Sequence, residues 1–315
     1  MNRQIIIFSH YGYSNYLELT LACAKKTNPL ARLIFLGDIK NKEVAESCGW
    51  EHYFLDSYHS DLTLRFENVF QHIQGKNHNH IKNGNDWLKF VFERWFFIEC
   101  FISTHKIDRF WHFDSDTMIV KELSKAAQNL LNYDFTVQCN NTCLNGVMNR
   151  DIVSAYCKHI CDLFEDTEFI AEQKLEFETV HPEYAFTEMS AFDDYKKKSD
   201  FRWANLMLYS DEYVFDDCIC QSHGFSMTKL LGGGRLVKDI EVIDGNFFGY
   251  RDGQKIKFIT LNLSWVHPYI FRWVLDSLDY KGHRYLRNSY PTLSEAFLVF
   301  LARLKLKLRN LINSH

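Results

Sequence analysis

Short apolar runs alternate with segments of helical spacing along the first part of the chain. Residues 4–9 are apolar and rich in β-branched side chains, and a polar loop follows them. The pattern repeats, so we predict strands at 4–9, 30–36 and 52–55, with helices at 16–26 and 42–48 between them. This β-α-β-α-β order is typical of a Rossmann-like α/β fold, with a mostly parallel central sheet flanked by helices.

The alternation continues through the middle of the chain. Residues 59–85 are polar, and we expect a helix and a mobile loop there. Asp86 is expected to cap a long aromatic helix at 87–104. The following pattern predicts helices at 123–131 and 151–164, a strand at 135–138, and a turn into a short strand at 144–149.

Beyond residue 165 the pattern is less regular. We expect a helix at 187–197. Two alternating stretches, at 236–243 and 255–263, predict strands on either side of a turn at 244–246. The C-terminal half is therefore expected to form the other side of a cleft within one domain.

Two carboxylates interrupt the apolar segment at 107–120. Asp114 and Asp116 are two residues apart, and an extended chain would place them on the same side. Paired acids in a buried setting are unfavourable without a cation, and Mg²⁺ or Mn²⁺ shared with substrate phosphates is the expected partner. A solvated turn or a helix cap is the alternative. The position at a strand end favours the metal, because open α/β sheets bind ligands there.

Composition narrows the class of protein. The chain has 315 residues, of which 46% are hydrophobic, which suffices for a large core. A net charge of −4 argues against general nucleic-acid binding. Nine cysteines with scattered spacing favour free thiols in a reducing cytosol. The sequence has neither a signal-peptide pattern nor an apolar run of about 18 residues, so we expect a cytoplasmic protein without a spanning helix.

The order of elements over roughly residues 4–150, together with Asp114-Ser-Asp116, resembles the GT-A class of nucleotide-sugar-dependent glycosyltransferases. The resemblance implies a single catalytic domain at 1–290. Its first half, 1–150, would bind the nucleotide sugar, and 151–290 would form the acceptor side. It also implies Mn²⁺ or Mg²⁺ held against the donor diphosphate. The ion would act as a Lewis acid on the leaving group.

The resemblance also assigns candidate residues to the metal site. Asp116 would bind the metal directly, and Asp114 would lie near the ribose or bind through water. The third ligand would be Asn262, His267 or a water molecule. Further candidate contacts to the nucleotide sugar are Ser9, His10, Tyr11, Asp38, Lys89, Arg94, Asp114, Ser115, Asn145 and Gly146.

Arg94 and a candidate general base, Glu188, each have a structural role as an alternative. Arg94 would face the phosphates, or else form an ordinary surface pair with Glu93 or Glu99. Glu188 is the candidate general base, with Asp193 in reserve. Acidic residues also stabilise the first turn of a helix, and Thr187 would cap that helix.

The C-terminal segment, residues 291–315, predicts a basic amphipathic helix. It would dock on the domain with its cations in water, or contact an anionic membrane surface through residues 292–312.

The leading hypothesis is a metal-assisted glycosyltransferase. It would use a nucleotide-diphosphate sugar, with UDP-sugar favoured, and a glycan or lipid-linked hydroxyl acceptor. By the resemblance it would act in bacterial surface-polysaccharide assembly at the inner face of the membrane. The alternatives are a sugar-phosphate nucleotidyltransferase and a non-catalytic GT-A-like binding protein. The loop after the first strand carries no cation except a protonated His10, which counts against the nucleotidyltransferase.

Overall fold

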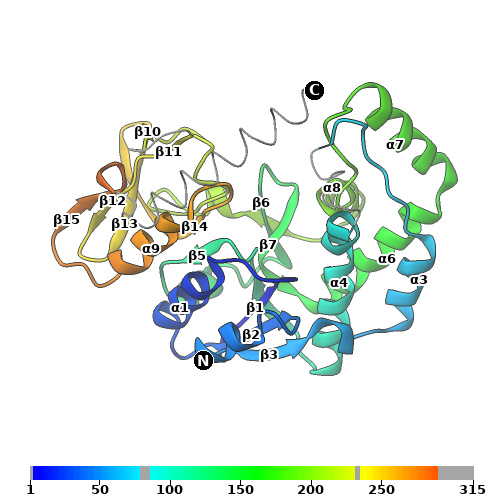
Figure 1. The fold of residues 1–315 in the computed structure, drawn as a ribbon, viewed down its shortest axis with the longest axis horizontal. Coiled ribbons are helices and arrows are strands. Elements are labelled where there is room, and N and C mark those ends of the chain that lie inside the picture. The colour runs from blue at the N-terminus through cyan, green and yellow to red at the C-terminus, as the bar shows by residue number, and fades with distance from the viewer. Residues whose placement is uncertain (1–2, 79–85, 231–234, 290–315) are drawn as a thin grey trace, which may run out of the picture.

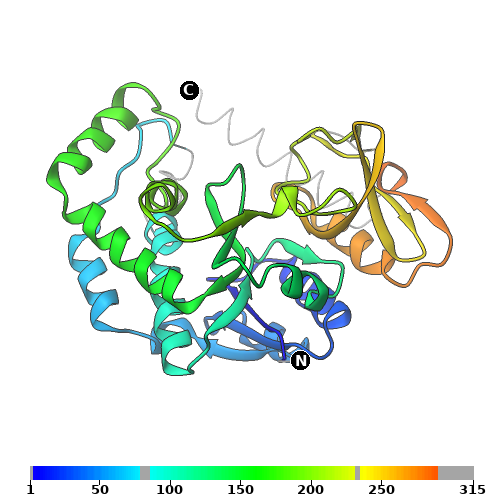
Figure 2. The same cartoon turned by 180° about the vertical axis from the view of Figure 1, so that it is seen from behind.

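A computed structural model describes residues 3–78, 86–230 and 235–289. It is a mixed α/β protein in which a seven-stranded sheet has the order β3-β2-β1-β4-β7-β6-β8 (Figure 1). A second sheet, built mainly from the C-terminal part, lies at the opposite end of the molecule from α3, α6 and α7 (Figures 1 and 2).

Four parallel strands form one half of the central sheet: β1 (Ile5–Ser9), β2 (Arg32–Gly37), β3 (Glu51–Phe54) and β4 (Arg109–His112). Helices α1 (Leu17–Thr27) and α2 (Lys42–Ser47) connect the first three, which confirms the predicted β-α-β-α-β order. In β1, Ile7 packs into one core, and Ile6 and Phe8 pack into another. Both faces are therefore buried, which is why these strands are apolar throughout.

An antiparallel strand separates the parallel half from the rest of the sheet. It is β7 (Cys143–Asn149), which pairs with both β4 and β6 (Phe135–Gln138), while β8 (Trp203–Asn205) runs parallel to β6. Two reversals leave β6 parallel to β4. The carboxyl ends of β1, β2, β4 and β6 consequently meet at one edge of the sheet.

Helices cover the two faces unequally. The larger core includes residues of α3 (Asp61–Val69), α4 (Asp86–Thr104), α6 (Arg150–Glu165), α7 (Thr167–Thr179) and α8 (Glu188–Lys198). The other face packs against α1, α2 and α5 (Ser124–Asn129). A short 3₁₀ turn, η1 (Leu55–Ser57), follows β3.

The second sheet has its own core and is covered by α9 (Pro268–Ser277). Its strands are β5 (Thr117–Ile119), β9 (Tyr213–Phe215), β12 (Glu241–Ile243), β13 (Asn246–Arg251), β14 (Gln254–Asn262) and β15 (His283–Tyr285). A two-stranded sheet, β10 (Met227–Lys229) with β11 (Leu236–Lys238), and two 3₁₀ turns, η3 (Leu206–Leu208) and η4 (Leu286–Asn288), complete the fold. Thr117 in β5 pairs with Asn262 in β14, so the acidic segment leads directly into the C-terminal sheet.

The predicted strand at 255–263 is confirmed as β14, but the prediction that 236–243 is one strand joined to it by a single turn was wrong. Residues 236–243 form two strands, β11 and β12, and the Asp244-Gly245 turn joins β12 to β13. A second turn, Asp252-Gly253, then joins β13 to β14. All four turn residues have positive φ, as tight antiparallel hairpins require. Two Asp-Gly turns where one was expected account for the missed strand.

Two predicted segments fall partly or wholly outside the described residues. They are the loop within 59–85, of which 79–85 are not described, and the C-terminal helix at 291–315. Among the helices that are described, none combines the length and apolar character needed to cross a membrane.

Candidate active site

The acidic motif forms a tight turn between β4 and β5. The Thr117 amide donates a hydrogen bond to the Asp114 carbonyl at 2.9 Å, which closes a four-residue turn. The expectation of an extended chain with both acids on one side was therefore wrong. The two carboxylates bind different partners: Asp114 contacts Arg94 and Asp116 contacts Ser264.

Arg94 links the partly buried Asp114 to the buried Glu188, 74 residues away in the chain. Its Nη1 donates to Asp114 Oδ1 at 2.7 Å and its Nη2 donates to Glu188 Oε1 at 3.1 Å. Arg94 lies on α4 and Glu188 begins α8, so this contact ties both helices to the acidic turn. The alternative of a surface pair with Glu93 or Glu99 was wrong, because the ion-pair partners of Arg94 are Asp114 and Glu188.

Lys89, one turn earlier on α4, is placed differently. Its amine pairs with Glu93 at 2.8 Å and with Glu67 at 3.4 Å, in a partly exposed cluster. Lys89 therefore forms ion pairs with carboxylates of α3 and α4, whereas Arg94 forms its ion pair with the acidic turn.

Burial and charge give the three acids different pKa values. Burial favours the neutral form of Asp114, but the Arg94 guanidinium outweighs this effect, and the pKa of Asp114 lies below its usual range. Burial raises the pKa of Glu188 to about 7, with Arg94 opposing the shift and Asp114 adding to it. Burial and the negative charge of Asp114 raise the pKa of Asp116 to about 6.

Asp116 is connected to the end of β14 through Ser264, a residue that the sequence reasoning missed. Ser264 Oγ lies 2.8 Å from Asp116 Oδ2 and 2.6 Å from Asn262 Oδ1. The Ser264 amide also donates to Asn262 Oδ1, at 3.0 Å. The second carboxylate oxygen, Asp116 Oδ1, is buried and accepts no hydrogen bond within the described residues. Asp116 thus keeps one carboxylate oxygen unpaired within the described part of the chain.

The loop after β1 lies against the same turn. His10 Nδ1 is 2.9 Å from Ser115 Oγ, and Ser14 Oγ is 3.1 Å from His10 Nε2. Tyr16 OH approaches Ser115 Oγ at 3.4 Å. Burial lowers the pKa of His10 to about 4, so this ring is neutral at physiological pH. The lowered pKa therefore argues against the protonated His10 that was considered as a cation for this loop.

The loops after β1 and β2 are joined by hydrogen bonds between side chains and backbone groups. Asp38 accepts hydrogen bonds from the Gly12 amide at 2.8 Å and the Lys40 amide at 2.9 Å. Asn41 donates to the carbonyls of His10 and Gly12. Ser9 Oγ is buried without a hydrogen-bond partner in the described residues. Tyr11 is exposed, and its ring contacts Phe90.

Asn145 and Gly146 lie on β7, beside the acidic turn. Asn145 is buried and contributes to lowering the pKa of Asp114. Gly146 has φ 91°, and a Cβ there would lie 2.3 Å from Thr136 Oγ1 and 2.5 Å from Leu206 Cδ1. Packing inside the protein therefore accounts for this glycine without a ligand.

Two predicted residues have other roles in the described structure. Asp193 pairs with Lys196 at 3.3 Å and Lys197 at 2.6 Å, both on its own helix. His267 caps α9, where its Nδ1 accepts a hydrogen bond from the Tyr269 amide. The expected side-chain cap by Thr187 is not formed. Within the described residues no three His, Cys, Asp or Glu side chains form a group able to hold a metal ion.

A second pair of acids, also missed by the sequence reasoning, follows β9. Asp216 forms a fully buried ion pair with Lys238 and accepts a hydrogen bond from the Asn262 amide at 3.1 Å. Asp217 accepts from the Asn140 amide at 3.2 Å, and burial raises its pKa to about 6. The sequence feature that could have indicated them is an Asp-Asp pair directly after the short apolar strand β9.

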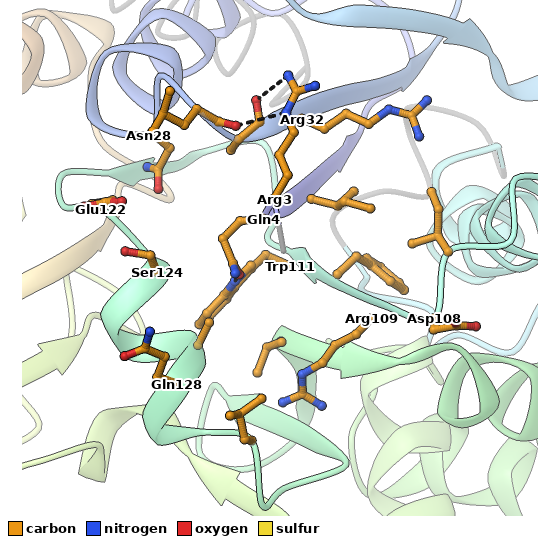
Figure 3. A pocket seen from close by; sticks show the side chains of 18 of the residues that line it. Arg3, Gln4, Asn28, Arg32, Asp108, Arg109, Trp111, Glu122, Ser124 and Gln128 are labelled. Carbon is orange, nitrogen blue, oxygen red and sulfur yellow. Dashed lines mark hydrogen bonds between the residues drawn. The ribbon is translucent and has the colours of Figure 1, made fainter. Parts of the chain in front are cut away.

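A cavity of about 780 Å³ lies at the other edge of the central sheet (Figure 3). Residues from the amino-terminal ends of β1, β2 and β4 and from α5 line it, and none is a predicted site residue. Trp111 and Gln4 lie in the middle of the view and are joined by a 3.0 Å hydrogen bond. A much smaller cavity, of about 10 Å³, lies among Arg94, Asn145 and Glu188, with room for roughly one water molecule.

No protein-family model and no curated protein matches the sequence. Among solved structures, a cytidylyltransferase from Leptospira borgpetersenii serovar Hardjo-bovis is similar with a TM-score of 0.29 and 11% identity. The match covers 62% of this chain and 94% of that chain. A similarity this low supports no assignment of function.

Proposed function

We propose that this protein is a metal-assisted glycosyltransferase of the GT-A type, which moves a sugar from a nucleotide-diphosphate donor to a hydroxyl acceptor. The observation that carries the proposal is the acidic turn. Asp116 keeps one buried oxygen without a partner, at the sheet edge where the loops after β1, β2, β4 and β6 meet. Open α/β sheets bind their ligands at that edge.

The oxygen donors at this turn fit a divalent cation that arrives with a diphosphate. Mg²⁺ and Mn²⁺ are commonly held by one or two carboxylates, substrate phosphates and water, so a third protein ligand is not required. Asp116 Oδ1 is available, and the lowered pKa of Asp114 keeps that carboxylate charged. Asn262 Oδ1 already accepts from Ser264, and His267 caps α9, so neither is favoured as the third ligand. When bound, the ion would neutralise the charge that develops on the leaving diphosphate.

The surrounding residues have separable roles in this proposal. The loop around neutral His10 and Ser115 would contact the uncharged part of the nucleotide. Arg94 fixes Asp114 and Glu188 relative to each other. Glu188 is the candidate to accept the proton of the acceptor hydroxyl, because a pKa of about 7 suits a base at neutral pH.

The described residues give less information about the acceptor than about the donor. A glycan or lipid-linked hydroxyl, and an enzyme active at the inner face of the membrane, follow from the GT-A resemblance. The sugar-phosphate nucleotidyltransferase is the second candidate. The neutral His10 weakens it, because the loop after β1 then offers no positive charge to a triphosphate.

Nucleotide release from a panel of nucleotide sugars, with and without Mn²⁺, tests the proposal. We expect metal-dependent release of UDP or GDP, and we expect Asp116→Asn to abolish it. Asp279→Asn, an exposed acid paired with Lys26, is the control and should keep full activity. Pyrophosphate release from a nucleoside triphosphate and a sugar phosphate would instead support the nucleotidyltransferase. Metal-dependent turnover that survives in Asp116→Asn would overturn the metal assignment.

A further inference from the structure

The cavity at the amino-terminal edge of the central sheet carries an excess of positive charge. It has a volume of about 780 Å³, and small-molecule sites typically have roughly 300–1,000 Å³. Among the described residues that line it, the basic ones are Arg3, Arg32, Lys106 and Arg109, and the acidic ones are Asp108 and Glu122. We propose that this cavity is a second ligand site, which binds a phosphate monoester of a small organic molecule.

Two of these charged side chains are neutralised by partners outside the cavity. Arg32 forms an ion pair with Glu51 at 2.8 Å, and Asp108 forms one with Arg150 at 3.0 Å. Three basic side chains and one acidic side chain then remain, so two positive charges are still in excess. A phosphate monoester carries about 1.5 to 2 negative charges at pH 7, whereas a monocarboxylate carries one. The phosphate monoester is therefore the better match in charge.

The Arg109 guanidinium is bonded to neutral groups. Its Nη1 donates to the Tyr133 carbonyl at 3.0 Å, and its Nη2 donates to the Leu130 carbonyl at 2.9 Å. Nη1 also donates to Asn149 Oδ1. In the part of the chain that the structure describes, Nε donates to no acceptor. Nε therefore remains as a donor for a ligand in the cavity.

Burial makes the charge of Arg109 favourable to an anion. Among the described residues, Arg109 forms no ion pair with a carboxylate, and Asp134 pairs with Arg202 instead, at 3.7 Å. Burial lowers the pKa of Arg109, and Asp134 only opposes this effect. Hydrogen bonds between a guanidinium and a phosphate are strong, because both groups are charged. A phosphate beside Nε would supply the negative charge that Arg109 lacks.

Arg3 and Gln4 extend the site away from Arg109. Arg3 donates to two backbone carbonyls just before β2, at 3.0 and 3.2 Å, which holds its guanidinium in place. The Gln4 side-chain oxygen accepts a hydrogen bond from Trp111 Nε1, so the Gln4 side-chain nitrogen is the atom that can donate to a ligand. In Figure 3, Gln4 and Trp111 lie between the guanidinium groups of Arg3 and Arg109. These donors suit the hydroxyl groups of a sugar, a glycerol or a nucleoside.

Isothermal titration calorimetry of the full chain tests the site with uridine 5′-monophosphate, glucose 6-phosphate and glycerol 3-phosphate. We expect at least one ester to bind with one molecule per chain, and its unphosphorylated counterpart not to bind. Arg109→Gln should weaken that binding by about tenfold or more, because it removes a charge-assisted hydrogen bond. Binding of none of the three esters, or equal binding of the unphosphorylated counterpart, would overturn the proposal. Tighter binding of lactate than of every ester would overturn the choice of a phosphate.

Three further variants locate the bound ester. Arg287→Gln removes a basic residue that pairs with Asp239 outside the cavity, and it should leave the affinity unchanged. Asp116→Asn should also leave it unchanged, because the acidic turn and the cavity lie at opposite edges of the sheet. Loss of binding in Asp116→Asn would place the ester at the acidic turn and overturn the proposal.

Arg3→Gln provides a second test inside the cavity if Arg109→Gln does not fold. Arg3 is exposed, so its removal should leave the melting temperature nearly unchanged. The ester should bind several-fold more weakly to Arg3→Gln than to the wild type. Unchanged affinity in this variant would show that the ester binds elsewhere.

Discussion

The guanidinium of Arg94 donates a 2.7 Å hydrogen bond to Asp114 Oδ1, so one acid of the motif is held by an arginine from the preceding helix. The same guanidinium binds Glu188 at 3.1 Å. The Arg94 and Glu188 side chains are largely buried, and the Asp114 side chain is partly buried, with 29% of its surface exposed. The arrangement keeps Asp114 charged and fixes α4, α8 and the β4–β5 turn relative to one another.

Removal of the Arg94 charge should destabilise the protein strongly. Arg94→Gln leaves two buried acids without their cation, and breaking such a pair typically lowers the free energy of unfolding by about 3–5 kcal/mol. Urea denaturation measures the change. Arg65→Gln is the matched control, because Arg65 also pairs with two acids, Asp162 and Glu165, but at the surface. It should lower the free energy by less than about 1 kcal/mol. Equal losses in both variants would contradict the bridging role.

Glu188 should make stability depend on pH. Its pKa is 4.5 in a model peptide and about 7 in the folded protein. Between these values the folded state holds a proton that the unfolded state has lost, so this group's contribution to the free energy of unfolding falls as pH rises through that window. Glu188→Gln removes the effect. The difference in stability between the variant and the wild type, measured from pH 4 to 8, should therefore rise in favour of the variant by about 1–3 kcal/mol. A constant difference across that range would refute the raised pKa.

Asp116 should show opposite effects on activity and stability. Its pKa is raised to about 6 because it is buried near Asp114, so its charged form is unfavourable at neutral pH. Asp116→Asn removes that charge and should raise the free energy of unfolding at pH 8 by about 1 kcal/mol. The same variant should lose metal-dependent nucleotide release. Thermal unfolding without metal measures the first effect, and a lower melting temperature for the variant would contradict it.

Gly146 should tolerate no side chain. Gly146→Ala would force a Cβ to 2.3 Å from Thr136 Oγ1 at a φ of 91°, so we expect a loss of more than about 2 kcal/mol. Gly253→Ala is the control, because Gly253 has φ 79° but no atom within 4 Å of the added Cβ. Its loss should be about 1 kcal/mol, from backbone strain alone. Urea denaturation of both variants separates the collision from the strain.

The sequence by itself determined the parallel half of the sheet and the location of the acidic motif. Strands buried on both faces must be apolar throughout, and the helices between them carry one apolar face. Both patterns lie within short stretches of sequence, so the sequence alone predicts these elements. The C-terminal half was harder to predict, because its short strands pair with distant partners. Thr117, for example, pairs with Asn262, and no local pattern encodes that register.

Only the tertiary structure decided how the acids are used. The bridge from Arg94 to Glu188 and the contact of Ser264 with Asp116 join residues from distant parts of the chain. The pKa of each acid depends on burial and on neighbouring charges, which exist only after folding. Asp114 and Asp116 are therefore alike in sequence, but folding gives one an arginine partner and leaves the other, within the described residues, with a buried oxygen that accepts no hydrogen bond.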